Sequence, residues 1–205
     1  MKHRLVKSAL AAAALSLGGA ALPAQAGPFD QLEVTETTTT FSQYDRVYIA
    51  PVIMDLTFDE QFRQIRRIQR PRRGATRPMT EAEIERKAND LHKDLVQALG
   101  KRLTIVDAPG EGVLTVQATV TRIIPSRPTG AELNQRIGLQ LGGSISAGGV
   151  DINAELSENG VSLAQIGEDY KSNLTDGIPR INIWQDADRG YNRFARKLSR
   201  YLARN

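Results

Sequence analysis

Residues 113–124 have the sequence VLTVQATVTRII, and this stretch decides the fold class. From Leu114 to Thr121, apolar side chains at even-numbered positions alternate with threonine or glutamine at odd-numbered positions. Successive side chains of a strand point to opposite faces, so this pattern predicts a strand with one apolar and one polar face. The apolar face belongs in a core, and the polar face is expected to meet solvent or a partner.

Further strands are expected on both sides of this one. Residues 150–156 alternate in the same way, and an apolar run covers residues 161–170. Asn159-Gly160 between them readily takes the positive φ values of a type I′ turn, which predicts a β-hairpin. Residues 46–53 are almost continuously apolar and are expected to form a strand buried on both faces, with Pro51 at a bulge or at its end. A short strand is expected at residues 103–106.

Two amphipathic helices are expected to cover this sheet. Thr80 and Glu83 form a T-x-x-E capping box at the start of the first helix, which extends to Leu99 and ends at Gly100. The second helix is expected over residues 183–203. Its inner face is the apolar stripe Tyr191, Phe194, Ala195, Leu198 and Leu202.

These elements predict an α+β fold, a two-layer α/β sandwich. The expected order is β-α-β-β-β-β-α, with a largely antiparallel sheet and both helices on one face. Residues 44–205 are expected to form a single domain with a basic insertion at 55–79. The threonine-rich stretch before it, 27–43, is interpreted as a flexible N-terminal linker, with an edge strand as the alternative.

The N-terminus has the three parts of a cleavable secretory signal peptide, residues 1–26. Three basic residues precede an uncharged Ala/Leu-rich stretch, and Ala24-Gln25-Ala26 places small residues before Gly27. The apolar stretch is too short to span ~30 Å of hydrocarbon, and no transmembrane segment is expected in the mature chain. The chain has no cysteine. We therefore expect a periplasmic or secreted protein, cleaved near Ala26-Gly27, that is not a lipoprotein.

Charge is distributed unevenly along the chain. The whole sequence has 27 Lys and Arg against 23 Asp and Glu, and the signal peptide removes three of the basic residues, leaving a formal charge of +1. This balance does not support a nucleic-acid-binding surface. One basic segment stands out as a possible contact for an anion or a partner, the alternative being a solvated charge run. It contains Arg63, Arg66, Arg67, Arg70, Arg72, Arg73 and Arg77.

No catalytic, cofactor or metal set is expected from the residue types. His92 is the only histidine of the mature chain and flanks the apolar face of the first expected helix, so it is interpreted as a structural residue, the alternative being a catalytic one. A zinc site would need an unusual carboxylate-rich set of ligands. The glycines of residues 138–149 lack the Gly-Lys-Ser/Thr ending of a phosphate-binding loop and are interpreted as a loop or a close backbone approach. Asp55, Asp59 and Glu60 could act as paired carboxylates, although early acidic residues are also typical of a helix N-terminus.

Three short segments carry a family resemblance. YDRVYIAPV at 44–52, DINAEL at 151–156 followed by the Asn-Gly turn, and IWQDA at 183–187 resemble the bacterial envelope family called domain of unknown function 3313. The resemblance covers about residues 29–203. It implies an exported protein, in a family that contains many lipoproteins and has no established molecular function. It therefore implies no catalytic residues.

The leading hypothesis is a non-catalytic periplasmic binding or accessory module. It would contact an envelope protein or an anionic envelope component through its open sheet face or its arginine segment. One alternative is a hydrolase or transferase that acts on an envelope polymer with carboxylates, such as Asp55 or Asp59, and arginines. The other is peripheral binding to anionic membrane surfaces.

Overall fold

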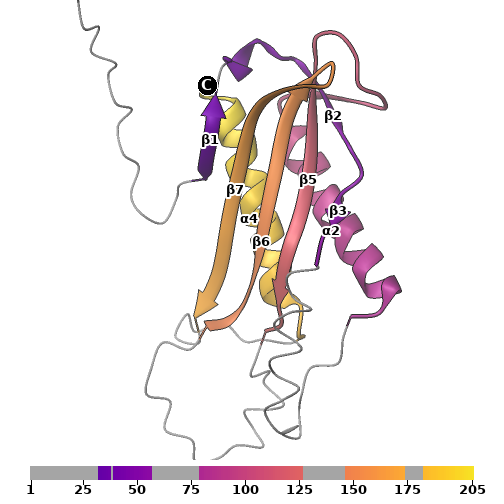
Figure 1. The fold of residues 1–205 in the computed structure, drawn as a ribbon, viewed down its shortest axis with the longest axis vertical. Helices are drawn as coiled ribbons and strands as arrows, with labels where there is room; N and C mark the ends of the chain where they lie inside the picture. The colour runs from indigo at the N-terminus through magenta and orange to yellow at the C-terminus, as the bar shows by residue number, and fades with distance from the viewer. Residues whose placement is uncertain (1–31, 38, 57–78, 127–145, 174–181) are drawn as a thin grey trace, which may run out of the picture. The chain divides into compact units, whose positions relative to one another are not determined.

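A mixed β-sheet and two long helices make up the described part of the chain (Figure 1). The computed structural model describes residues 32–37, 39–56, 79–126, 146–173 and 182–205. The sheet has seven strands in the order β1-β7-β6-β5-β2-β4, and β3 also pairs with β5. The strands are β1 (Glu33–Thr37), β2 (Arg46–Ile49), β3 (Ile53–Met54), β4 (Thr104–Val106), β5 (Val113–Ile124), β6 (Ser146–Glu158) and β7 (Val161–Asn173). The helices are α2 (Glu81–Leu99), α4 (Gln185–Leu202) and the short 3₁₀ helix η1 (Phe41–Gln43). The predicted α+β class is confirmed.

The sheet combines an antiparallel part and a parallel part. The long strands β5, β6 and β7 pair antiparallel, and β1 extends them along the outer edge of β7. The short strands β2, β3 and β4 make only parallel pairs. Parallel neighbours need a crossover connection, and α2 lies in the one that joins β3 to β4. The antiparallel expectation therefore holds for the long strands, and the sheet as a whole is mixed.

Both helices lie on the same face of the sheet (Figure 1). The even-numbered residues of β5 point into this layer, and Leu114, Val116, Ala118 and Val120 are all fully buried. The predicted inner stripe of α4 is buried against them. The alternation read from residues 113–124 thus correctly separates a covered face from an open face.

The local signals of the sequence appear as expected. Thr80 Oγ1 accepts a hydrogen bond from the Glu83 backbone N–H, and the Glu83 carboxylate accepts one from the Thr80 N–H, which completes the capping box. Gly100 ends α2 in a right-handed conformation, with φ −63°. Asn159 and Gly160 have φ values of 50° and 77°, which fit the predicted turn of the β6–β7 hairpin.

The strand expected at residues 46–53 is divided into β2 and β3, and Pro51 lies between them. The Pro51 carbonyl accepts a hydrogen bond from Gln117 Nε2 at 2.7 Å, so a side chain of β5 takes the place of a ladder bond. The expectation that this strand is buried on both faces is wrong. Val47 and Ile49 are buried but Arg46 is exposed, because the helices cover one face only.

The segment expected to be a flexible linker, 27–43, contains regular structure in its second half. Residues 33–37 form β1, with Thr35 opposite Gln165 of β7. Phe41 is only 1% exposed, and its ring lies 5.8 Å from that of Tyr201. β-branched threonines suit an edge strand, so the alternative interpretation describes residues 33–37. Most of the expected basic insertion at 55–79 lies outside the described residues.

Two close contacts join the long strands to the segments packed around them. Near the hairpin turn, the Glu158 carboxylate accepts hydrogen bonds from Tyr44 Oη and from the Gly112 backbone N–H, each at 2.7 Å. On the covered face, α4 approaches the sheet so closely at Gly190 that a Cβ atom there would lie 2.3 Å from Val150 Cγ1. These contacts hold the long strands in place beneath their open face.

Candidate functional site

The open face of the sheet presents rows of polar side chains. Strand register places Thr35, Gln165, Glu155 and Gln117 side by side in one row that crosses β1, β7, β6 and β5. The next row across the same strands consists of Glu33, Gly167, Asn153 and Thr119. These rows continue the polar face that the sequence of β5 predicts.

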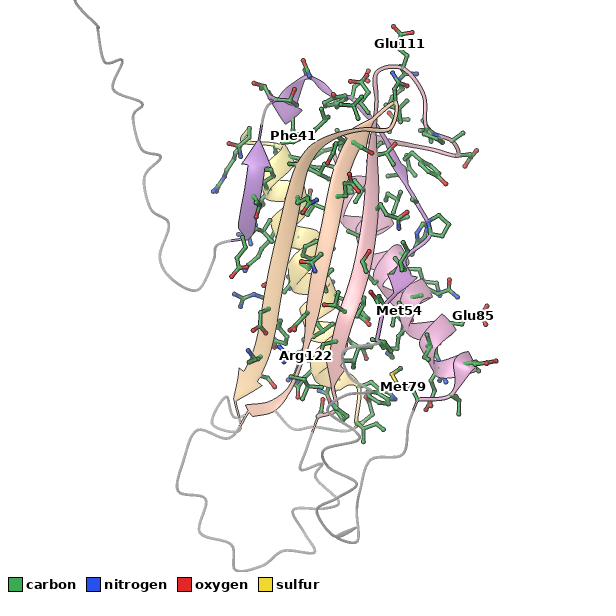
Figure 2. The ribbon with its side chains drawn as sticks, viewed as in Figure 1. Phe41, Met54, Met79, Glu85, Glu111 and Arg122 are labelled. Carbon is green, nitrogen blue, oxygen red and sulfur yellow. The ribbon has the colours of Figure 1, made fainter. Side chains whose placement is uncertain are left out.

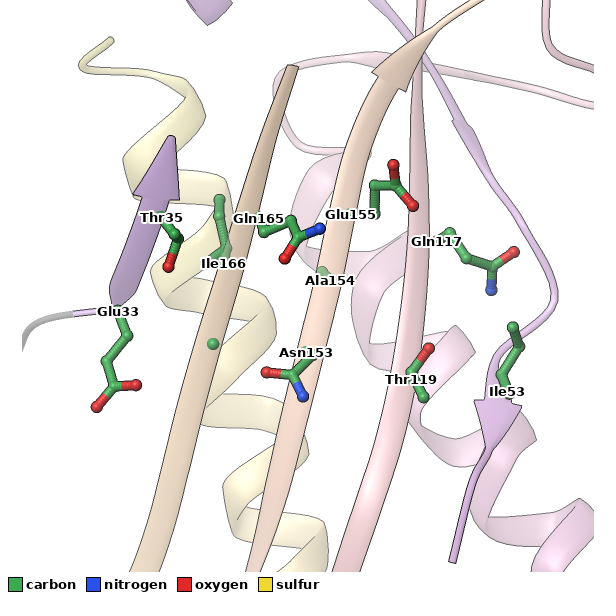
Figure 3. Close-up of a pocket in the computed structure, with 11 residues that line it drawn as sticks. Glu33, Thr35, Ile53, Gln117, Thr119, Asn153, Ala154, Glu155, Gln165 and Ile166 are labelled. Atoms are coloured by element: carbon green, nitrogen blue, oxygen red, sulfur yellow. The ribbon is translucent and has the colours of Figure 1, made fainter. Parts of the chain in front are cut away.

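A shallow hollow of about 460 Å³ lies between these two rows (Figure 3). Ile53 of β3 forms one side of it, and Glu33 and Thr35 of β1 form the opposite side. Gly167 has no side chain, which leaves space on β7. The hollow therefore depends on both of the short strands that flank the long antiparallel ones.

The hollow offers hydrogen-bonding groups to a ligand or partner. Asn153, Glu155 and Gln165 are exposed there and supply amide and carboxylate groups. Among the described residues, none forms a salt bridge with Glu33 or Glu155. Such a surface can hold a polar partner by hydrogen bonds, and its charge disfavours an anionic one.

A second feature of the open face is a group of four charged residues, Arg122, Asp151, Asp169 and Lys171, which we call the aspartate cluster. Arg122 Nη2 lies 2.6 Å from Asp151 Oδ2 and 3.9 Å from Asp169 Oδ2. Lys171 forms an ion pair with Asp169. A register shift in β5 between Val120 and Arg122 places the arginine opposite Asp151 of β6. Figure 2 shows Arg122 near the lower end of β5.

The two carboxyl groups of the cluster have different proton affinities. Burial raises the pKa of Asp151 to about 6, the neighbouring Asp169 adds to this, and Arg122 opposes it. Burial alone would also raise the pKa of Asp169, but hydrogen bonds from Lys171 and Asp151 outweigh it and hold that pKa below its ordinary value. Because the two pKa values are separated, a proton bound to the pair is held mainly by Asp151.

The structure brings together few of the residues singled out from the sequence. The seven arginines lie outside the described residues, as do Asp59, Glu60 and the first glycines of the 138–149 stretch. Asp55 is exposed just after β3. His92 lies on α2, and its Nδ1 atom is buried without a hydrogen-bond partner in the described part of the chain. No group of three or more potential metal ligands occurs among the residues that the structure describes.

Two of the glycines can be assigned a structural role. Gly148 and Gly149 lie within β6, and a Cβ atom at Gly149 would be only 2.1 Å from the Tyr170 carbonyl oxygen. At Gly148 it would be 2.7 Å from Asp186 Oδ2. At these two positions, the interpretation of the glycines as a close backbone approach is confirmed.

The two long helices, α2 and α4, are amphipathic and not apolar throughout. Neither α2 nor α4 contains a stretch that is both long and apolar enough to span a bilayer. Their polar residues instead point away from the core or take part in ion pairs such as Lys87–Asp90 and Lys197–Glu168.

Comparisons with known proteins identify a family and several similar solved structures. The family model described as "Protein of unknown function (DUF3313)" matches residues 34–198. The PelC dodecamer from Paraburkholderia phytofirmans is 12% identical, with a TM-score of 0.46 over 85% of this chain and 99% of that one. Protein XCC0632 from Xanthomonas campestris is 12% identical, with a TM-score of 0.45 over 85% of this chain and 92% of that one. No curated protein matches the chain.

Proposed function

Because this chain belongs to the DUF3313 family of proteins of unknown function, we propose its function from the site itself. It is a non-catalytic binding module of the cell envelope that holds a protein partner against the open face of its sheet. The observation that carries the proposal is the polar hollow, which crosses five strands on the face that no described helix covers.

The chemistry of the hollow favours a protein partner over an anionic surface. Glu33 and Glu155 are carboxylates without a salt bridge to any described residue, and they would repel phosphate groups or anionic lipid headgroups. Exposed amides such as Gln165 can donate and accept hydrogen bonds, which suits backbone and side-chain groups of a protein. Binding to an anionic envelope component would instead have to use the arginine segment.

The described carboxylates do not support the alternative of an envelope-polymer hydrolase or transferase. Asp151 and Asp169 are the carboxyl pair on the open face of the described sheet, and Arg122 and Lys171 are bound to them. On the helices, Asp90 and Asp188 lie close together, but both are bound to Lys87. In glycoside hydrolases the two carboxyl groups stand about 5–10 Å apart, with the sugar between them. Here the Asp151 and Asp169 side chains are within hydrogen-bonding reach of each other, which leaves no room for a sugar between them.

Site-specific photo-crosslinking in cells tests the proposed face. A photoreactive residue at Gln165 or Asn153 should give a defined protein adduct, because both positions border the hollow. The control position is Glu85, an exposed residue of α2 that points away from the sheet (Figure 2). Adducts should disappear in the double variant Glu33→Lys, Glu155→Lys. Equal adducts from Glu85, or none from the open face, would contradict the proposal.

The envelope location rests on the predicted signal peptide and needs its own test. We expect the protein in a periplasmic extract to begin at Gly27, as determined by N-terminal mass spectrometry. A chain that retains residues 1–26 in the cytoplasmic fraction would contradict this part of the proposal. Alanine at both Lys2 and Arg4 should reduce export and leave the fold unchanged.

A further inference from the structure

Two aspartates stand directly opposite each other in the β6–β7 ladder. The register pairs Asp151 with Asp169, and both side chains belong to the open face. Like charges in directly opposite positions destabilise an antiparallel pair. The sheet therefore needs a means of neutralising one of the two charges.

The neighbouring groups do this only in part. Arg122 Nη2 contacts Asp151 at 2.6 Å but stands 3.9 Å from Asp169, which is paired with Lys171. Asp151 Oδ1 and Arg122 Nε are buried and have no hydrogen-bond partner among the residues that the structure describes. With side-chain exposures of 23% and 26%, Asp151 and Arg122 are also removed from most of the solvent. The cluster is therefore not fully satisfied when all four groups are charged.

We propose that Asp151 and Asp169 form a proton-binding pair that fastens the end of the β6–β7 ladder in mildly acidic medium and loosens it at neutral pH. With one proton bound, the Asp151 carboxyl group donates a hydrogen bond to the Asp169 carboxylate across the two strands. When the proton leaves to solvent, the hydrogen bond between the two carboxyl groups is lost and two carboxylates face each other. Lys171 is paired with Asp169 and Arg122 with Asp151, and the remaining repulsion between the carboxylates favours opening of the ladder.

The charges around the pair are consistent with this behaviour. Arg122 from β5 and Lys171 from β7 are the described charged groups that act on the two aspartates. Glu168, Arg193 and Lys197 belong to the covered face, on the other side of the sheet. The raised pKa of Asp151, about 6, places proton release between mildly acidic and neutral conditions. The release is independent of the partner proposed above.

Titration of the carboxyl carbons by NMR between pH 4 and 8 tests proton binding. We expect a midpoint near 6 for Asp151 in the wild type. Asp169→Asn removes the opposing charge and should lower this midpoint by at least one pH unit. Glu155→Gln, on the same strand and face, should leave it unchanged. An Asp151 midpoint below about 4.5 in the wild type would overturn the proposal.

Amide hydrogen exchange tests the loosening itself. After correction for intrinsic rates, the amides of residues 149–152 and 168–171 should open about tenfold more often at pH 7.5 than at pH 5, as expected from one pKa unit of coupling. In Asp151→Asn this pH dependence should disappear, and Asp169→Asn provides a second variant if the first does not fold. The same pH dependence in both variants, or none in the wild type, would overturn the proposal.

Discussion

The two faces of the sheet are formed by alternate residues of the same strands, and they differ in burial: one is covered by the helices and the other is open. On β6, Ile152 and Leu156 are at most 1% exposed beneath the helices, whereas Asn153 and Glu155 between them are exposed at the hollow. Alternate side chains of a strand point to opposite faces, so neighbouring residues belong to different environments. The residues that stabilise the core and those of the proposed binding face are thus separate residues of one segment, so each set can be changed without the other.

The charged groups of the two faces differ in the same way. On the covered face, Glu168 accepts hydrogen bonds from Arg193 and Lys197, both at 2.8 Å, and its side chain is 5% exposed. On the open face, Asp151 has a similarly short contact with Arg122 but is 23% exposed. The contact distances of Glu168 and Asp151 are similar, but Glu168 is much more buried. Removing the Glu168 carboxylate should therefore cost more free energy of unfolding than removing the Asp151 carboxylate.

The largest effect is expected from Glu168→Ala. Removing this carboxylate leaves Lys197 buried without its partner, which should lower the free energy of unfolding by about 3–5 kcal/mol. The matched change Glu155→Ala on the open face should cost less than about 0.5 kcal/mol. Urea denaturation of both variants measures the difference, and equal losses would break the contrast between the faces.

A second comparison uses adjacent residues of β6. Ile152→Ala creates a cavity beneath the helices and should cost about 2–5 kcal/mol. Asn153→Ala should change stability by no more than about 0.5 kcal/mol while reducing photo-crosslinking at the hollow. Urea midpoints and adduct yields together check this pair. A large stability loss for Asn153→Ala would show that the open face contributes to the core of an assembly.

The pH dependence of the free energy of unfolding should reveal the contribution of the aspartate cluster. The pKa of Asp151 rises from 3.8 to about 6 on folding, so the folded state binds this proton more tightly. Its contribution to stability is present in acid and is lost as pH rises from about 4 to 6, by at most about 3 kcal/mol. The pKa of Asp169 is lowered on folding, so its contribution to stability has the opposite sign of pH dependence. It is present above the ordinary aspartate pKa, near 4, and is lost as pH falls below that value.

Asp151→Asn removes the first of these contributions. Urea midpoints measured at intervals from pH 4 to 7 should then decline less between pH 4 and 6 than in the wild type, and the raised pKa of Asp94, which is partly buried, accounts for the decline that remains. Glu155→Gln serves as the control and should retain the wild-type decline. A wild-type stability that rises across this interval would contradict the assignment of the raised pKa to Asp151.

The smallest effect is expected from a pair of glycines. In Gly190→Ala the new methyl group would meet Val150 and Tyr170 on the covered face, at 2.3 and 2.9 Å. Overpacking should cost about 1–2 kcal/mol even though alanine is the better helix former. In Gly167→Ala the nearest atom is Asn153 Oδ1 at 3.1 Å, on the open face, where that side chain can move. Thermal midpoints should fall for Gly190→Ala and stay within about 2 °C for Gly167→Ala.

Local patterns predicted the elements that have a strong local cause. The alternation of residues 113–124, the Thr80–Glu83 capping box and the Asn159-Gly160 turn each depend on neighbours in the sequence, and each is confirmed. The bounds of β1 and β3 were not predicted, because both strands are short and are stabilised by pairing with β7 and β5. Residues 33–37 were an edge strand only in the alternative interpretation, and Ile53 was expected at the end of one continuous strand. The polar face was therefore predictable, and the hollow that these strands enclose was not.

The aspartate cluster could not be predicted from the sequence, because it depends on a register shift in the β6–β7 hairpin. A two-residue turn at Asn159-Gly160 pairs Glu158 with Val161, and continuing that register would place Asp151 opposite Glu168. A shift between Leu156 and Ser157 moves the register by one residue and places Asp151 opposite Asp169. A register shift of one residue moves each side chain of a strand to the opposite face of the sheet, and no local feature of the sequence indicates it.

The position of β1 in the sheet has a consequence for the order of folding. Glu33 pairs with Gly167, so β1 closes a loop that contains nearly the whole domain, whereas the β6–β7 hairpin closes across two residues. The entropy of loop closure makes such distant pairings form late, and we expect β1 to add to an already formed hairpin. The same strand is then the first to peel away, which exposes the edge of β7 before the rest of the sheet unfolds.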